Sequence, residues 1–249
     1  MPVKSTCTHV VVLAIAFFSI LDLEELWIAF GAGKAFRYIT IHEIAASLGQ
    51  EKCKSLSLFH AFTGCDQTSA FAGRWKSTAW NTCMAYQEAT DVFRSLSKTP
   101  TADKVSNAIP TIQWFVVLMY DRARAKEDVN AARKTMFRQK ERSLENIPPA
   151  SATLVQHTKR VVYQDGHCWR RCLQSSPVLP SPSDWGWKKS SSQTWKPLWT
   201  SLTEASKACQ ELLRCGWHPG KGCGGRCKCI KAALQCTALC KCEGDCERD

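Results

Sequence analysis

Short apolar runs and amphipathic segments alternate along the first hundred residues. Residues 10–16 are continuously apolar and rich in β-branched side chains, a pattern typical of a parallel strand that is covered on both faces. Two further apolar runs, each followed by Gly or polar residues, have the length of short strands. The pattern therefore predicts strands at residues 10–16, 26–30 and 36–41.

Helical spacing of apolar residues dominates elsewhere in the chain. A short helix is predicted to continue the first strand, and Gly49 separates two later helices. From residue 108 onward the pattern is mainly helical, with a break at Pro148 and Pro149. The predicted helices cover residues 21–25, 42–48, 51–63, 150–173 and 203–214. Strands that alternate with helices of this length indicate an α/β domain.

Four tryptophans lie on either side of a polar turn at residues 188–194. Trp185 and Trp187 precede the turn, and Trp195 and Trp199 follow it. Two aromatic strands across a Ser-rich turn predict a β-hairpin. We expect these rings to pack on the helical region, and an exposed peptide-binding patch is the alternative.

The last forty-one residues contain most of the cysteines. They hold nine of the fifteen, at positions 209, 215, 223, 227, 229, 236, 240, 242 and 246. Large aliphatic side chains are few in this segment, so it cannot bury enough apolar surface to fold without cross-links. The cross-links are either disulfides or metal–thiolate bonds.

The spacing favours metal over disulfides. The two Cys-x-Cys pairs are too tight for an easy internal disulfide, and an odd number of cysteines leaves one thiol over. In an extended Cys-x-Cys the two sulfurs point to opposite faces, so each would bind a different ion. Structural zinc contributes about 10–16 kcal/mol in small peptides, enough to order such a segment. A secreted, disulfide-bonded knot is the alternative.

The net charge and the N-terminal apolar run bear on the partner and the location of the protein. The chain carries 33 Lys and Arg against 22 Asp and Glu, a net charge of +11 that suits a nucleic acid or another anionic surface. The apolar run at residues 10–21 is shorter than the ~20 residues of a membrane span and leads to no clear cleavage site. We therefore expect an intracellular protein, in the nucleus or cytoplasm, with no membrane partner; a signal sequence is the alternative.

The spacing C-x3-C-x-C-x6-C-x3-C-x-C-x3-C from Cys223 to Cys246 resembles a tesmin-type CXC domain. The resemblance implies that nine thiolates hold three zinc ions and that the module binds DNA. The implied ligands are Cys215, Cys223, Cys227, Cys229, Cys236, Cys240, Cys242 and Cys246. The family expects another Cys-x-Cys upstream, where this chain has Trp217, so Cys209 or His218 would supply the ninth ligand. Arg226, Lys228 and Lys231 would contact phosphates.

The segment LFHAFTGCDQTSAFAGRWKSTA, residues 58–79, resembles the flap-endonuclease branch of PIN-like nucleases. The resemblance covers residues 6–80 and implies a parallel sheet with helices and a cluster of carboxylates that binds two Mg2+ ions. Asp66 matches the aspartate of the family's Gly-Cys-Asp motif. Combined with a cysteine-rich tail, the segment resembles uncharacterised proteins derived from mobile elements.

The nuclease resemblance is incomplete in its functional residues. Cys7-Thr8-His9 stands where the family has Asp-x-Asp, and the family's other acids lie further upstream, so Asp66 is a vestigial site residue. Mg2+ prefers oxygen ligands, which makes Cys7 and His9 poor substitutes. Zinc held by Cys7, His9 and Asp66 is a less favoured alternative, because the set is incomplete for a catalytic site.

The family's glycine-lysine hairpin is also altered. Arg74 and Lys76 remain candidate DNA contacts, but Trp75 stands where a glycine would let the backbone approach a phosphate. We expect Trp75 to pack against the protein; stacking on a base is the alternative.

The sequence thus predicts an α/β protein with four parts and no small-molecule substrate. A degenerate nuclease-like domain, a helical region, the Trp-rich hairpin and the zinc module would occupy residues 1–98, 99–180, 181–202 and 203–249. The favoured function is non-catalytic zinc binding with duplex DNA as partner, in a protein derived from a transposable element. A metal-dependent, structure-specific nuclease that uses Asp66, or a fragment of one, is the alternative.

Overall fold

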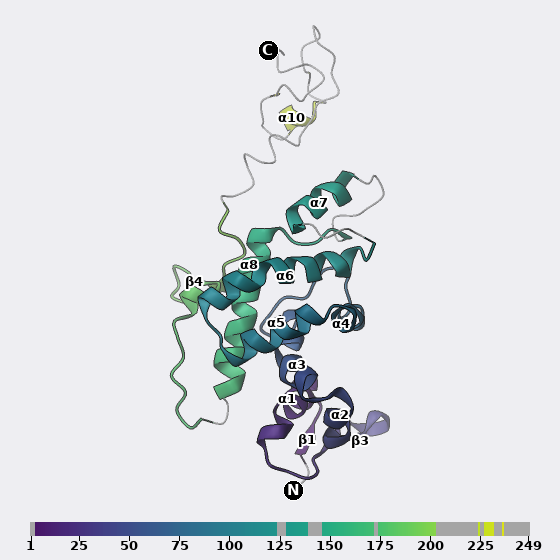
Figure 1. Ribbon diagram of the computed structural model, residues 1–249. Coiled ribbons are helices and arrows are strands. Elements are labelled where there is room, and N and C mark those ends of the chain that lie inside the picture. The colour runs from purple at the N-terminus through teal and green to yellow at the C-terminus, as the bar shows by residue number, and fades with distance from the viewer. Residues whose placement is uncertain are drawn as a thin grey trace. The chain divides into compact units, whose positions relative to one another are not determined.

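The computed structural model divides the chain into two compact units, Met1–Ser201 and Leu202–Asp249. It describes residues 3–123, 128–138, 146–171, 174–202, 224, 227–231 and 236. The first unit contains a small sheet with its helices at the N-terminal end and a larger helical body (Figure 1). The second unit is described around one short helix, α10 (Lys228–Lys231).

A three-stranded sheet forms the start of the first unit. Its strands are β1 (Val3–Ser5), β2 (Trp27–Phe30) and β3 (Arg37–Thr40), in the order β1-β2-β3. The predicted strands at residues 26–30 and 36–41 are confirmed. β1 and β2 are parallel, but β3 pairs antiparallel to β2, so the sheet is mixed and the prediction of a parallel sheet is wrong in this respect.

Residues 10–16 form a helix, not the predicted strand. They belong to α1 (Thr8–Phe17), which buries Ile15, Ala16 and Phe17 and packs on a later helix. A continuous apolar run carries no period that separates a buried strand from a buried helix, and packing overrides the strand preference of its β-branched residues. The predicted helix at residues 21–25 is absent. A short 3-10 turn, η1 (Phe18–Ile20), precedes a stretch in which Asp22 has φ +50°.

The two helices predicted around Gly49 are confirmed within one residue. They are α2 (Ile41–Leu48) and α3 (Gln50–Phe62). Gly49 has φ +77°, a left-handed conformation that glycine adopts without steric cost, and this ends one helix and begins the next. A 3-10 turn, η2 (Gly33–Ala35), links β2 to β3.

Five longer helices build the body of the first unit. They are α4 (Lys76–Ala85), α5 (Gln87–Lys98), α6 (Ala102–Tyr120), α7 (Val129–Arg138) and α8 (Ser151–Val162). Among them α5 and α8 pack on α3, while α6 packs on α4, α5, α7 and α8. The rings of Phe62, Phe93 and Phe115 meet at centroid separations of 5.3–6.0 Å in the centre. Burial of such rings is a main stabilising contribution.

The end of α8 departs from regular geometry. A π-helical turn, η4 (Tyr163–Cys168), and a 3-10 turn, η5 (Trp169–Arg171), continue it, so the helix predicted at residues 150–173 is partly confirmed. The π turn buries Asp165, which accepts a hydrogen bond from Ser97 Oγ. Burial raises the pKa of Asp165, against the opposing effect of its serine partners and Arg170.

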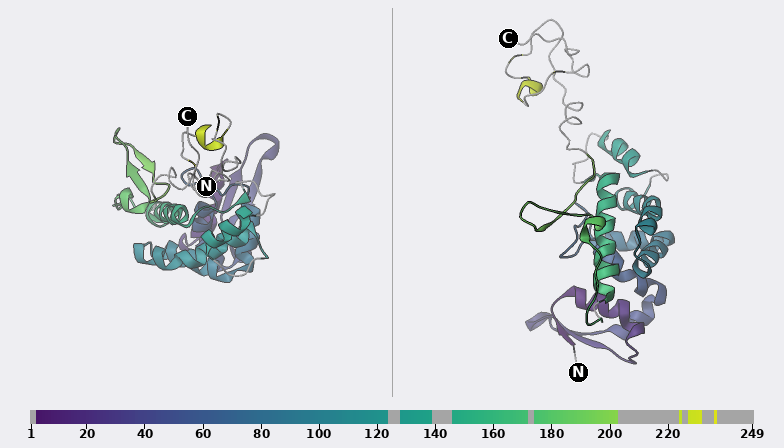
Figure 2. Two further views of the ribbon diagram at one scale, coloured as in Figure 1. Left: turned by 90° about the horizontal axis from the view of Figure 1, so that it is seen from above. Right: turned by 90° about the vertical axis from the view of Figure 1, so that its left-hand side faces the viewer.

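The predicted tryptophan hairpin is confirmed. After a 3-10 turn, η6 (Pro182–Trp185), β4 (Trp187–Lys189) pairs antiparallel with β5 (Trp195–Pro197), and the hairpin lies beside α8 (Figure 2). The guanidinium of Arg160 on α8 donates to the carbonyl oxygens of Gly186 and Leu198, at 3.1 and 2.7 Å. These bonds fix the base of the hairpin to the helix.

Only some of the four tryptophans pack on the helical region as expected. Trp185 is buried in the main core, and Trp187 is partly buried against it. Trp195 and Trp199 keep 38% and 55% of their surface exposed. The hairpin therefore contributes one buried ring to the core and leaves two accessible.

The carboxyl end of α3 is buried, and its carbonyl groups are satisfied by side chains from several segments. His157 Nε2 donates to Phe62 O at 2.9 Å, and Lys76 Nζ donates to His60 O at 2.9 Å. Thr68 Oγ1 donates to Ala61 O. The last carbonyls of a helix have no partner within the helix, so a buried helix end requires such contacts. Within the described ranges, no helix combines the length and apolar composition needed to cross a bilayer.

We expect His157 to make the first unit sensitive to acid. Burial, the largest cause, and the charge of nearby Arg160 lower the pKa of His157 from 6.5 to about 4. Between pH 6.5 and pH 4, His157 is protonated in the unfolded chain but neutral in the folded chain. The free energy of unfolding therefore falls as the pH drops. The loss between pH 7 and 4 should reach about 3 kcal/mol from this residue.

Urea unfolding followed by tryptophan fluorescence at pH 7 and pH 4.5 would measure this effect. His157→Gln keeps a donor for Phe62 O but cannot titrate, so its free energy of unfolding should change less between the two pH values. The measurement at pH 7 gives the stability that the substitution loses through altered packing, so this loss can be subtracted from the pH effect. Equal pH dependence in the two proteins would contradict the assignment.

Candidate metal centre

Three cysteines of the second unit bring their sulfur atoms together. The sulfurs of Cys227, Cys229 and Cys236 all lie within 4.8 Å of one another, and those of Cys227 and Cys236 are 4.0 Å apart. Cys227 and Cys229 are each 1% exposed, and Cys236 is partly buried. With Zn–S bonds of about 2.3 Å, two tetrahedral ligands stand ~3.8 Å apart. The cluster therefore has the spacing of thiolates that share one ion.

A tight turn creates this arrangement. Cys227 directly precedes α10, its amide donates to Gly224 O at 2.8 Å, and its carbonyl accepts from the Lys231 amide at 3.0 Å. Cys229 lies inside the helix. The Cys-x-Cys pair is therefore helical rather than extended, and the expectation that its two sulfurs point to opposite faces is wrong for this pair.

The structure describes only part of the predicted ligand set. Each cysteine that it describes is a thiol rather than part of a disulfide. Lys228 and Lys231 are exposed on α10, beside the buried sulfurs. The other predicted ligands and one predicted phosphate contact lie outside the described residues: Cys209, Cys215, His218, Cys223, Arg226, Cys240, Cys242 and Cys246. Three thiols can hold a metal ion; the residues shown do not identify which metal.

Asp66, the residue that the nuclease resemblance singled out, lies in the loop after α3. Its side chain is 81% exposed, and its Oδ2 is 3.8 Å from His9 Nδ1. Cys7 Sγ is 3.2 Å from the same nitrogen. Among the described residues, the cysteine cluster is the one group whose three candidate ligand atoms lie mutually within 4.8 Å. In the part of the chain that the structure describes, Asp66 therefore belongs to no carboxylate cluster of the kind that binds two Mg2+ ions.

Sequence reasoning missed His60, which lies on α3 with its ring centroid 4.7 Å from that of His9. The ring is 6% exposed, and its Nε2 is buried with no hydrogen-bond partner. Burial lowers the pKa of His60 to about 4, with smaller contributions from the charges of Lys76 and His9. Helical spacing alone marks His60 as an ordinary core position, so its proximity to His9 is visible only in the fold.

The candidate DNA contacts Arg74 and Lys76 both interact with the protein. The Lys76 ammonium donates to His60 O and to Thr63 Oγ1, each at 2.9 Å, and burial lowers its pKa to about 8. The Arg74 guanidinium lies over the Tyr120 ring, 4.4 Å from the centroid. Trp75 between them is 79% exposed, so the expectation that it packs is wrong.

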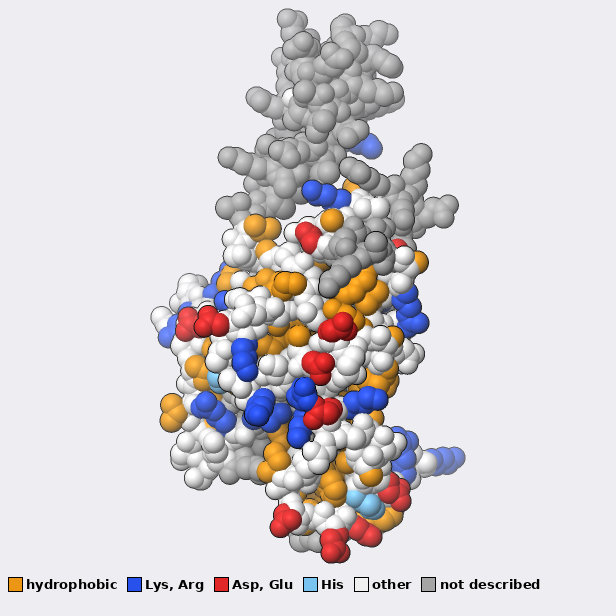
Figure 3. Space-filling view, in the orientation of Figure 1, with side chains coloured by type: hydrophobic (Ala, Val, Ile, Leu, Met, Phe, Trp, Pro, Cys, Tyr) orange, Lys and Arg blue, Asp and Glu red, His pale blue; other side chains and the backbone are white. Residues whose placement is uncertain are grey.

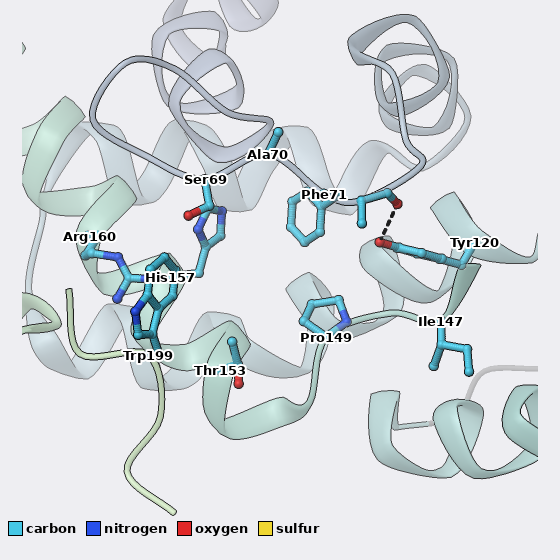
Figure 4. A pocket seen from close by; sticks show the side chains of 11 residues that line it. Ser69, Ala70, Phe71, Tyr120, Ile147, Pro149, Thr153, His157, Arg160 and Trp199 are labelled. Atoms are coloured by element: carbon cyan, nitrogen blue, oxygen red, sulfur yellow. Dashed lines mark hydrogen bonds between the residues drawn. The ribbon is translucent and has the colours of Figure 1, made fainter. Parts of the chain in front are cut away.

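The first unit also contains a mainly apolar pocket of about 270 Å³. Figure 4 shows Phe71 and Trp199 on its walls and Tyr120 donating to Ala72 O. Its polar groups serve the fold: His157 bonds to Phe62 O, and Arg160 bonds to backbone carbonyls under the ring of Trp199. The pocket offers mainly apolar contact, and its His157 and Arg160 side chains are bound to backbone carbonyls.

Comparisons with protein-family models, with curated proteins and with solved structures find no match to this chain. The resemblances to PIN-like nucleases and to CXC modules therefore remain predictions from the sequence.

Replacing Cys227 with alanine should weaken zinc binding by the second unit by more than about 100-fold, because loss of even an outer-shell contact weakens metal sites 10–100-fold. Zinc per chain, measured by native mass spectrometry on protein purified under reducing conditions, would report the loss. Cys168→Ala, which removes a partly buried thiol of the first unit, is the matched control and should leave the zinc content unchanged. Equal zinc content in the wild type and Cys227→Ala would contradict the site.

Proposed function

We propose that this chain is a non-catalytic zinc-binding protein whose cysteine-rich C-terminal module contacts duplex DNA. The approach of the Cys227, Cys229 and Cys236 sulfurs carries the proposal. A segment with nine cysteines and few large aliphatic side chains needs cross-links to fold, and zinc–thiolate bonds would supply them. Derivation from a mobile element is part of this proposal and rests on the sequence resemblance.

Charge supports DNA as the partner of this module. Lys228 and Lys231 are exposed and one helical turn apart on α10, so both can approach neighbouring phosphates. On the face of the first unit shown in Figure 3, Lys and Arg side chains are interspersed with Asp and Glu. Mixed charges of this kind favour a solvated surface over a phosphate-binding one. The C-terminal module is therefore the better candidate for contact.

The alternative, a metal-dependent nuclease that uses Asp66, has less support. The nearest candidate ligands to Asp66 are an imidazole and, beyond it, a thiol, whereas Mg2+ prefers several oxygen ligands. Two-metal phosphodiester cleavage needs a set of carboxylates that clamps both ions. We therefore favour the binding protein.

Replacing Lys228 and Lys231 with glutamine should weaken duplex DNA binding and lower the slope of log K against log salt by about 1.8, since each phosphate contact contributes ~0.9. Filter binding over a salt series measures both effects. Lys188→Gln with Lys196→Gln, which removes the same charge from the hairpin, should leave the slope unchanged. Absence of salt-dependent DNA retention by the wild type would contradict the DNA-binding part of the proposal.

We expect no cleavage of branched DNA in the presence of Mg2+ or Mn2+, because Asp66 lacks carboxylate partners among the described residues. Gel electrophoresis of labelled flap and junction substrates would test this. Cleavage by the wild type that disappears in Asp66→Ala would overturn the non-catalytic proposal in favour of the nuclease.

A further inference from the structure

Two candidate metal ligands lie together where β1 leads into α1. The Cys7 amide donates to Ser5 Oγ at 3.0 Å, and Cys7 then takes the position before the first turn of α1. His9 follows in that turn, with its Nδ1 3.2 Å from Cys7 Sγ. Because β1 and β2 are parallel, this junction is at their carboxyl ends, the edge of an α/β sheet where ligands usually bind.

Asp66 approaches the same imidazole nitrogen from the loop after α3. Its Oδ2 is 3.8 Å from His9 Nδ1. In a thiol–imidazole–carboxylate relay the acid and the nucleophile contact different ring nitrogens, so this geometry is not that of a relay. Sulfur, nitrogen and oxygen ligands of a tetrahedral zinc ion stand ~3.3–3.6 Å apart, given bonds of about 2.0–2.3 Å. The two distances to His9 Nδ1 are close to this range.

The buried His60 provides a further nitrogen next to this group. Its Nε2 has no hydrogen-bond partner, although an unsatisfied buried polar atom is costly. Its ring stands edge to face against that of His9 at 4.7 Å. The ring of Trp169 lies 5.8 Å from His9 and 6.2 Å from His60, so an apolar side chain shields both imidazoles. A bound metal ion would satisfy the orphaned nitrogen.

We propose that Cys7, His9 and Asp66, with His60 as the fourth ligand, form a second metal site, in the first unit, for a divalent ion of the zinc class. One thiolate and one carboxylate balance the two charges of the ion, and both imidazoles bind as neutral ligands. The site occupies the place where the nuclease resemblance implies Mg2+, but its donors are mainly sulfur and nitrogen, which select a softer metal.

Binding an ion would require the four ligand atoms to draw together around it. Cys7 Sγ and Asp66 Oδ2 each already approach His9 Nδ1. The exposed side chain of Asp66 is free of core packing and can rotate toward the ion. The nearby Lys76 ammonium is held by the backbone oxygen of His60 and by Thr63 Oγ1, and not by any of the proposed ligand atoms. This site shares no residue with the C-terminal cluster, so each can fail without the other.

Protection of Cys7 from alkylation tests the site directly in the full-length protein. The chain is first treated with a chelator, then given Zn2+ and iodoacetamide, and the modification of Cys7 is followed by peptide mapping. Because the thiolate is the reacting species, coordination should slow Cys7 alkylation at least about tenfold. Millimolar Mg2+ should not slow the alkylation of Cys7. Reading Cys7 itself makes the result independent of zinc bound by the C-terminal cysteines.

Variants of the other ligands decide whether zinc binds Cys7 as part of a site. His9→Gln, Asp66→Asn and His60→Gln should each reduce the protection, whereas Cys65→Ser, next to Asp66, should leave it intact. Near-ultraviolet circular dichroism shows whether the buried His60 variant keeps its fold, and the exposed Asp66 variant provides the test if it does not. Equal alkylation of Cys7 with and without Zn2+, or full protection in His9→Gln, would overturn the proposal.

Discussion

The buried carboxyl end of α3 is the constraint on which the first unit depends. A helix end inside a protein must find donors for its last carbonyl groups, and water cannot supply them there. His157 from α8, Lys76 from the start of α4 and Thr68 from the intervening loop donate to consecutive residues of that end. These bonds draw distant segments onto α3, and the aromatic rings around Phe62 then fill the space between them.

The same constraint determines what the side chains near Asp66 can do. Lys76 donates to the carbonyl of His60 in α3 and to the hydroxyl of Thr63, so its charge is used inside the protein. Arg74 stacks on Tyr120, while the ring of Trp75 is left exposed. The nuclease resemblance implies that this loop contacts phosphate, but here Arg74 and Lys76 contact the protein instead. Lys228 and Lys231 in the second unit are exposed.

Both units contain sulfur or nitrogen side chains of the kind that bind soft metal ions. Sulfur atoms gather at Cys227, Cys229 and Cys236 in one unit, and a thiol, imidazoles and a carboxylate gather at the start of α1 in the other. Neither arrangement offers the several oxygen ligands that Mg2+ requires. Thiol and imidazole donors fit a softer metal ion better than they fit Mg2+.

The sequence by itself determined the elements with a clear local signal: α2 and α3 on either side of Gly49, β2 and β3, and the tryptophan hairpin. It also marked the cysteine-rich tail, because close cysteine spacing is a local property. Only the tertiary structure decided that residues 10–16 are helical, since an unbroken apolar run fits a buried helix as well as a buried strand. It alone brought His60 next to His9, because contacts between residues more than fifty positions apart arise from packing and leave no pattern in the local sequence.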